Sequence, residues 1–127
     1  MALLLASAVV VIGLRLRVRR GVRPARISPQ DFGLRGSGVA IVGFSSPFCA
    51  PCRAWEAALA EQGIAFTKVD VSERGALAIK YGIRQTPLLL AVRLPAGDVL
   101  DAYHGEPQPG DIERLRALAH TGADVGV

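Results

Sequence analysis

Short apolar runs alternate with helical stretches from residue 39 onward. Val39–Phe44 and Leu88–Val92 are nearly continuous apolar runs of strand length, and Ile64–Val71 contains a further strand with apolar residues at 66, 69 and 71. Pro95–Gly97 predicts a turn, after which Val99–Tyr103 returns as a fourth strand. The last two strands should therefore form an antiparallel hairpin.

Three helices are expected between and after these strands. Arg53–Glu61 has its apolar residues on one side, and Gly63 ends it. Ser72 is expected to cap a second helix that carries Ala76–Ile79 and ends near Gly82. A third helix opens in the Pro-Gly-Asp segment at 109–111, and its apolar face comprises Ile112, Leu115, Leu118 and Ala119.

The order of elements is strand, helix, strand, helix, strand, strand, helix. Strands that alternate with helices predict parallel pairing, and the hairpin adds an antiparallel edge. We therefore expect an α/β fold with a central mixed sheet of about four strands flanked by helices. Ahead of it, Ser28–Asp31 is typical of a helix start, and the glycines at 33, 36 and 38 limit that helix to a short turn.

The N-terminal segment differs from the rest of the chain. Ala2–Leu14 has no charged residue and would be about 20 Å long as a helix, which is short of the roughly 30 Å hydrocarbon core of a bilayer. Extension to Val18 approaches spanning length and adds two arginines, whose long stems can reach the headgroups. We expect an N-terminal hydrophobic helix that anchors the chain in a membrane, with a cleaved signal peptide or an interfacial segment as the alternatives.

Positive charge is confined to the stretch after this apolar run. The formal net charge is +4, but six arginines lie between positions 15 and 26 with no acidic residue among them. The remaining nine basic and eleven acidic residues all follow, so the rest of the chain lacks the basic face of a nucleic-acid-binding domain, and no nucleic-acid partner is expected. The positive-inside rule places the arginines, and everything after them, on the cytoplasmic side.

These observations divide the 127 residues into four parts. We predict a membrane anchor with a basic flank over residues 1–20, a linker over 21–30, a single folded domain over 31–121 and a flexible tail over 122–127. The length suits one domain, and we expect it to be a monomer.

The chain contains only two cysteines, Cys49 and Cys52. Their disulfide would close almost no loop, so it would add little stability. A tetrahedral zinc site needs two further ligands, and the only two histidines lie far along the chain, so we expect neither a metal nor a cofactor. The pair lies between the first strand and the first helix, where the helix N-terminus favours a thiolate at Cys49. Pro51 stiffens the turn between the two thiols.

Several segments resemble one known family. Phe44–Arg53 is similar to the active-site segment of thioredoxins and of their membrane-anchored relatives. Tyr81–Leu90 is similar to the family's segment before and through its cis-proline, while Lys68–Asp70 and Gly105 match the end of the central strand and the glycine after the last strand. The matches run from residue 39 to about 120. The resemblance implies a thioredoxin fold and a membrane-anchored thiol–disulfide oxidoreductase.

The resemblance also implies roles for individual residues. Cys49 would attack a protein disulfide and Cys52 would resolve the mixed disulfide, while the reverse steps would oxidise a substrate dithiol. Pro87 would be the family's cis-proline, which brings the Thr86 backbone beside the cysteines to pair with an extended substrate. A thiol electron donor, which the sequence does not identify, would reduce the pair again. The expected substrate contacts are Phe48, Ala50, Pro51, Thr86 and Pro87.

Some positions depart from the family pattern. Gly43 stands where thioredoxins have a buried aspartate that helps move the proton of the second cysteine, Phe48 replaces a tryptophan, and Ala57 replaces a proline that kinks the helix. Lys68 matches a lysine near the buried acid, but its usual partner is missing. Glu56, one turn after the second cysteine, is a candidate substitute, although a solvated helix face is the simpler explanation.

Three functions fit this sequence. The leading hypothesis is a membrane-anchored reductase that faces the cytoplasm. An extracytoplasmic reductase for cytochrome or metal-site cysteines would use the same chemistry on the other side of the membrane. A non-catalytic thioredoxin-fold binding module is the third, and Gly43 in place of the acid is its best support.

Overall fold

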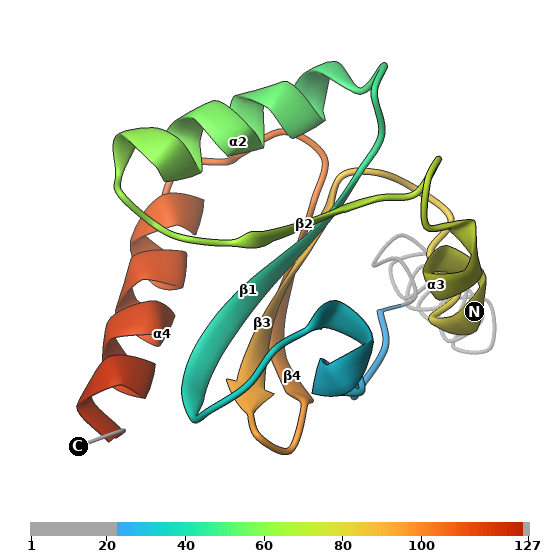
Figure 1. Cartoon of the computed structure of the whole chain (residues 1–127). Helices are drawn as coiled ribbons and strands as arrows, with labels where there is room; N and C mark the ends of the chain where they lie inside the picture. The colour runs from blue at the N-terminus through green and yellow to red at the C-terminus, as the bar shows by residue number, and fades with distance from the viewer. Residues whose placement is uncertain (1–22, 126–127) are drawn as a thin grey trace, which may run out of the picture.

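A computed structural model describes residues 23–125 of the chain (Figure 1). The elements are η1 (Pro29–Phe32), β1 (Gly38–Ser45), α2 (Ala50–Glu61), β2 (Thr67–Asp70), α3 (Gly75–Lys80), β3 (Leu88–Leu94), β4 (Asp98–His104) and α4 (Asp111–Val125). This confirms the predicted order of strands and helices. The predicted membrane anchor lies outside the described residues, whereas α4 extends into the segment 122–125 that the sequence assigns to a tail. Within residues 23–125, no helix is both long and apolar enough to cross a membrane.

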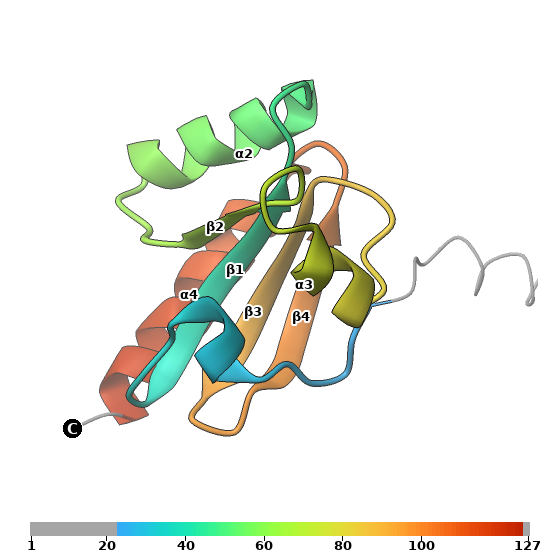
Figure 2. The same ribbon diagram turned by 45° about the vertical axis from the view of Figure 1, so that its right-hand side comes forward.

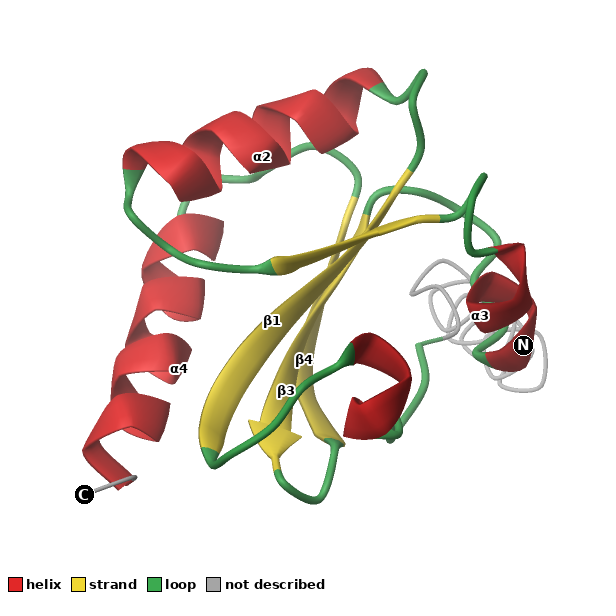
Figure 3. Ribbon diagram, viewed as in Figure 1, coloured by secondary structure: helices red, strands yellow, loops and turns green. Residues whose placement is uncertain are grey.

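The four strands form one mixed sheet in the order β2-β1-β3-β4 (Figure 3). β1 and β2 are parallel, with Gly43 opposite Lys68, because α2 carries the chain back across the sheet before β2 begins. β1 and β3 are antiparallel, with Gly43 opposite Leu89, and β3 and β4 form the antiparallel hairpin. β1 is therefore a central strand, and the cysteine pair follows directly after it.

The two faces of the sheet are covered by different helices (Figure 2). α2 and α4 cover one face, which we call the helix face, and η1 and α3 cover the other, which we call the opposite face. Successive side chains of a strand point to opposite faces, so each strand contributes to both cores. The core of the helix face contains Ile41, Trp55, Leu59, Leu89, Ala91, Tyr103 and Leu115. The core of the opposite face contains Ile27, Phe32, Val42, Phe44, Val69, Leu88, Leu90, Val92 and Leu94.

Helix starts differ in detail from the sequence prediction. α2 begins at Ala50, three residues before the predicted Arg53, because Cys49 serves as its N-cap and a proline fits the first turn. Ser72 does not cap α3, whose N-cap is Arg74. The backbone N–H and the hydroxyl of Ser72 instead donate to Asp70 Oδ1, at 2.8 and 2.6 Å, so Ser72 belongs to the turn that ends β2.

The chain ahead of η1 packs against the edge strand β4. The Ile27 N–H donates to the Gly97 carbonyl and the Val99 N–H donates to the Ala25 carbonyl, both at 3.0 Å. The Ile27 side chain is 2% exposed and belongs to the core. Gly97 has a φ of +93°, and a Cβ there would lie 2.0 Å from the Ile27 oxygen, so only glycine fits. The folded unit therefore starts ahead of the predicted domain boundary at residue 31 and includes part of the predicted linker.

A polar cluster ties η1 to α3 on the opposite face. Asp31 Oδ2 lies 2.6 Å from Lys80 Nζ and accepts a hydrogen bond from the Tyr81 hydroxyl, also at 2.6 Å. The same hydroxyl accepts a hydrogen bond from the Ser28 N–H at 2.9 Å. The hydrogen bond from Lys80, and then that from Tyr81, lower the pKa of Asp31 below its usual value. The Asp31 carboxylate thus joins η1 to the end of α3, where the rings of Phe32 and Tyr81 are also in contact.

Candidate active site

Cys49 and Cys52 lie at the start of α2 and are joined by a disulfide, with their Cα atoms 5.2 Å apart. Cys49 is extended, and its Sγ accepts a hydrogen bond from the Cys52 N–H at 3.2 Å. The two residues differ in exposure, because Cys49 is partly exposed while Cys52 is only 2% exposed. Cys49 is therefore the more accessible residue of the pair.

Two loops meet around this pair. Arg53 Nη2 donates to the Ser45 hydroxyl at 3.1 Å and to the Ser46 carbonyl at 3.0 Å, so the residue after Cys52 holds the end of β1. The Ser46 hydroxyl lies 3.2 Å from the Thr86 hydroxyl, which joins the cysteine loop to the loop ahead of β3. The Thr86–Pro87 peptide bond is cis, as the resemblance implies.

The expected substrate contacts lie on these two loops and in the first turn of α2. Phe48 is fully exposed beside Cys49, Ala50 is exposed, and Pro51 is partly exposed. Thr86 is partly buried, and Pro87 is buried and lines the same cavity as Cys52. Phe48, Ala50 and Pro51 are thus chain neighbours of Cys49, while Thr86 contacts the cysteine loop through Ser46 and Pro87 lies beside Cys52. A bare aromatic ring at this place offers apolar surface to a partner.

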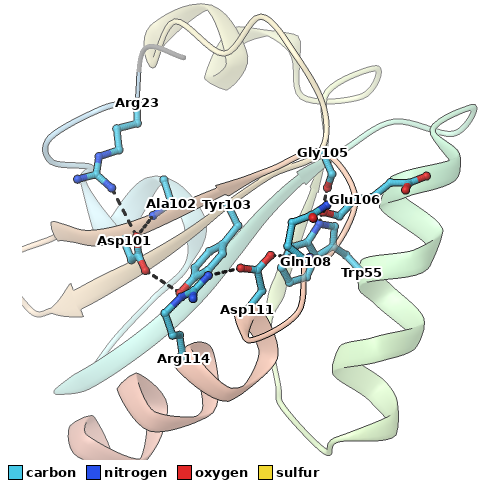
Figure 4. Close-up of polar contacts among 10 residues, drawn as sticks. All are labelled: Arg23, Trp55, Asp101, Ala102, Tyr103, Gly105, Glu106, Gln108, Asp111 and Arg114. Carbon is cyan, nitrogen blue, oxygen red and sulfur yellow. Dashed lines mark hydrogen bonds and ion pairs between the residues drawn. The ribbon is translucent and has the colours of Figure 1, made fainter. Parts of the chain in front are cut away.

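A polar and aromatic network fixes α2 to the last strand and the last helix (Figure 4). Trp55 Nε1 donates to the Gly105 carbonyl at 2.7 Å, and its ring packs edge-on against Tyr103 at 5.7 Å between centroids. The Tyr103 hydroxyl donates to Asp101 Oδ2 at 2.7 Å, and burial, followed by this hydrogen bond, raises the pKa of Tyr103 to about 12. Asp111 continues the network through its ion pair with Arg114. The helix that carries the cysteines is therefore anchored at one site by both packing and hydrogen bonding.

The apolar side of the helix predicted over Arg53–Glu61 accounts for the burial of Trp55 but not for its hydrogen bond to Gly105. The helical period places Trp55 on the buried side of α2 but does not identify Gly105 as the acceptor. Gly105 was recognised only because it matches the family. Tyr103 is a core residue of the helix face.

A small cavity lies beneath the buried sulfur. Its volume is about 10 Å³, and Gly43, Cys52, Glu56, Phe66 and Leu89 are among its lining residues. Their side chains are uncharged except for the carboxylate of Glu56. The absence of a side chain at Gly43 leaves this space next to the sheet.

Glu56 is not on a freely solvated helix face. Its Oε1 is buried and accepts no hydrogen bond among the described residues, although Lys68 Nζ lies 2.8 Å away as an ion-pair partner. Its Oε2 lies 3.3 Å from Arg53 Nε. The simpler explanation of Glu56 is therefore wrong, and Lys68 has a partner after all, on α2 rather than on β1.

Comparison with known proteins identifies the family. The thioredoxin family profile matches residues 32–116, which is well over half of the chain. The chain belongs to the thioredoxin family. Thioredoxin-1 of Caenorhabditis elegans is 32% identical over 90 residues, a match that covers 67% of this chain and 75% of that protein.

Solved structures agree with this thioredoxin assignment at the level of the fold. A thioredoxin from Malassezia sympodialis superposes with a TM-score of 0.56 at 23% identity, covering 78% of this chain and 96% of the other. A reduced thioredoxin from Schistosoma mansoni has the same TM-score at 22% identity, with coverage of 66% and 82%.

The thioredoxin domain and the paired cysteines together establish the activity class. The Cys-Ala-Pro-Cys segment lies at the strand–helix junction and its sulfurs are within bonding distance. The chain is a thiol–disulfide oxidoreductase that uses the Cys49/Cys52 pair, and protein disulfides are its substrate class. In the part of the chain that the structure describes, no cluster of His, Cys, Asp and Glu could hold a metal ion.

Proposed function

We propose that this thioredoxin domain reduces protein disulfides, with Cys49 as the attacking nucleophile and Cys52 as the resolving thiol. The observation that carries the assignment is the unequal exposure of the two sulfurs at the start of α2. Only Cys49 is open to a large substrate, while Cys52 is 2% exposed. An attack on a protein disulfide needs the accessible sulfur.

The helix start supports Cys49 as the thiolate. It is the N-cap of a 12-residue helix, where unpaired N–H groups and the helix dipole stabilise a negative charge. The Cys52 N–H already donates to its sulfur at 3.2 Å. A thiolate formed at this position attacks one sulfur of the substrate disulfide and releases the other as a thiol.

The surrounding loops supply the substrate contacts of the proposal. An extended substrate segment pairs with the Thr86 backbone next to the cis-proline Pro87. The exposed Phe48 ring, with Ala50 and Pro51, covers the apolar side of that segment. Cys52 then attacks Cys49 Sγ, which frees the reduced substrate and closes the disulfide.

The proposal includes a membrane anchor over residues 1–20, with the thioredoxin domain on the cytoplasmic side. The uncharged run of Ala2–Leu14 and the arginines that follow it support this arrangement. The cytosol keeps thiols reduced, so a pair exposed there is supplied with electrons and acts as a reductase. Alkaline phosphatase fused to the C-terminus should be inactive in cells, since it folds only after export. An active fusion would place the domain outside and favour the extracytoplasmic alternative.

Two cysteine variants test the assigned roles. The full chain, purified in mild detergent, should reduce insulin with dithiothreitol as the donor. Cys49→Ser should abolish this activity, and Cys52→Ser should accumulate a mixed disulfide between Cys49 and the substrate, visible on a non-reducing gel. Ala57→Ser, at an exposed position of the same helix, is the control and should behave as the unmodified chain. Full activity in Cys49→Ser, or trapping by Cys49→Ser alone, would overturn the assignment.

A further inference from the structure

We infer that Glu56 accepts the proton of the Cys52 thiol and passes it to solvent, in place of the aspartate that is absent at position 43. The inference rests on the proposed role of Cys52 as the resolving thiol. The position of Glu56 on α2 does not by itself mark this residue as functional.

The buried thiol needs a proton acceptor. Cys52 is 2% exposed, and a thiolate in an apolar environment is strongly disfavoured unless a nearby group takes up the proton. Gly43 on β1 contributes no side chain to the cavity below it. Glu56 is the one acid among the residues that line this cavity. It follows Cys52 by four positions, which places the two side chains on the same side of α2.

Glu56 also connects the cavity with solvent. Its side chain is 25% exposed, while Oε1 is buried and has Lys68 Nζ as its ion-pair partner at 2.8 Å. The carboxylate therefore extends from the buried cavity wall to water. The cavity volume of about 10 Å³ is at the lower limit for one water molecule, which is enough for a single relay step.

Two cations hold Glu56 in place. Lys68 Nζ lies 2.8 Å from Oε1 on the β2 side, and Arg53 Nε lies 3.3 Å from Oε2 on α2. β1 and β3 contribute only uncharged residues to the cavity walls. These contacts fix the position of the carboxylate at the wall of the cavity that Cys52 also lines.

Resolution moves one proton and exchanges one disulfide bond for another. The Cys52 Sγ–H proton moves through one water to Glu56, and the resulting thiolate attacks Cys49 Sγ of the mixed disulfide. The Cys49–Cys52 bond forms, and the bond between Cys49 and the substrate sulfur breaks. The substrate sulfur leaves with the electron pair and takes a proton from solvent, so the substrate is reduced and the cysteine pair is oxidised. Glu56 then releases its proton to water at its exposed edge.

The test separates the two steps of the reaction. The reduced full chain is mixed with a short peptide disulfide, quenched with acid at successive times and analysed by mass spectrometry between pH 5 and 9. Glu56→Gln should leave the formation of the mixed disulfide unchanged and slow its resolution at least tenfold at pH 7, because general bases contribute about 10²–10⁴-fold. The defect should shrink as the pH rises, since hydroxide then deprotonates Cys52.

Three further variants exclude a structural explanation. Glu61→Gln, an exposed acid on the same helix, is the matched control and should not change either step. Lys68→Gln removes the same ion pair but keeps the acid, and should slow resolution much less than Glu56→Gln. Gly43→Asp in the Glu56→Gln background should restore most of the rate, because the nearest atom to a Cβ at this position is Phe66 Cδ2, at 3.4 Å.

Several results would overturn the inference. They are an unchanged pH profile of resolution in Glu56→Gln, an equal loss of both steps, or an equal loss in Lys68→Gln. Failure of the proposed cysteine roles would look different, because Cys52→Ser would then trap no mixed disulfide whether Glu56 is present or not.

Discussion

The helix face and the opposite face of the sheet are built in different ways. α2 and α4, with 12 and 15 residues, cover the helix face, and an aromatic pair of Trp55 with Tyr103 joins α2 to the sheet. The opposite face is covered by η1 and α3, with only 4 and 6 residues, together with the chain that runs along β4. One face is thus covered by long helices, and the other by short helices that the Asp31 carboxylate links.

This difference separates two tasks of the molecule. α2 packs against the core and has both cysteines at its start. A substitution in the core of the helix face should therefore also change the surroundings of the two sulfurs. The elements that cover the opposite face, η1 and α3, do not carry the cysteines. Disturbance of that face should lower the stability of the domain and leave the reduction potential of the cysteine pair unchanged.

The largest effect is expected for Trp55→Ala on the helix face. The variant removes a ring that is 2% exposed and its hydrogen bond to Gly105, so the free energy of unfolding should fall by about 3–5 kcal/mol. The start of α2 should also move, which should shift the reduction potential by on the order of 30 mV, or about 1.4 kcal/mol. Urea unfolding and glutathione equilibration measure the two quantities. An unchanged potential would break the comparison of the two faces.

Phe32→Ala is the counterpart on the opposite face. Phe32 is buried and packs edge-on against Phe44 at 5.8 Å between centroids, so its loss should cost about 3 kcal/mol in urea unfolding. The reduction potential should stay within about 5 mV of the unmodified chain, a difference of about 0.2 kcal/mol. A shift as large as that of Trp55→Ala would show that both faces control the sulfurs.

Tyr81→Phe should have a smaller effect. The substitution removes one hydroxyl that donates to Asp31 and accepts from the Ser28 N–H, while the ring and its contact with Phe32 remain. The expected loss is about 1 kcal/mol of unfolding free energy, typical of a hydrogen bond. The midpoint of urea unfolding measures it, and no change at all would mean that the polar cluster does not hold η1 to α3.

The smallest effect should be a dependence on acid pH. The pKa of Asp31 is below its ordinary value of 3.8, so the unfolded state binds the proton more readily. The stabilisation is therefore complete above about pH 4 and is lost as the pH falls through the native pKa. Asp31→Asn should lose less stability than the unmodified chain between pH 5 and pH 2.5 in urea unfolding. An identical pH dependence in both proteins would exclude Asp31 as a source of acid sensitivity.

Local patterns predicted most of the fold. β1 and β3 were recognisable because their runs of apolar residues are buried on both faces, and glycines and prolines separate the strands from the helices. The start of α2 was placed three residues too late because the cysteine at position 49 forms its N-cap, which apolar periodicity does not reveal. The packing of Ile27 was missed because it depends on a glycine 70 positions away whose missing Cβ makes room for the backbone.

The candidate site shows the same limit. The cysteine pair and the Thr86–Pro87 segment were predictable, because their spacing and order carry the chemistry. The surroundings of Glu56 were not, since the helical period places it near Cys52 but says nothing of burial. Its ion pair with Lys68 joins α2 to β2. Such a contact depends on how the helix packs against the strand, which local sequence patterns do not predict.

The pairing of the chain along β4 limits how far the folded domain can lie from the proposed membrane anchor. Ala25 is hydrogen-bonded to Val99 of β4 and Ile27 to Gly97 just ahead of it, and Arg23 lies 3.7 Å from Asp101 in an ion pair. If residues 1–20 lie in the membrane as proposed, the free tether is two residues long and extends less than about 10 Å. β4 runs in the same direction as β1, so Arg23, beside Asp101 of β4, is nearer than Ile27 to the end of the sheet that carries the cysteines. The sulfurs would then work close to the lipid headgroups, on disulfides of proteins held at the same surface.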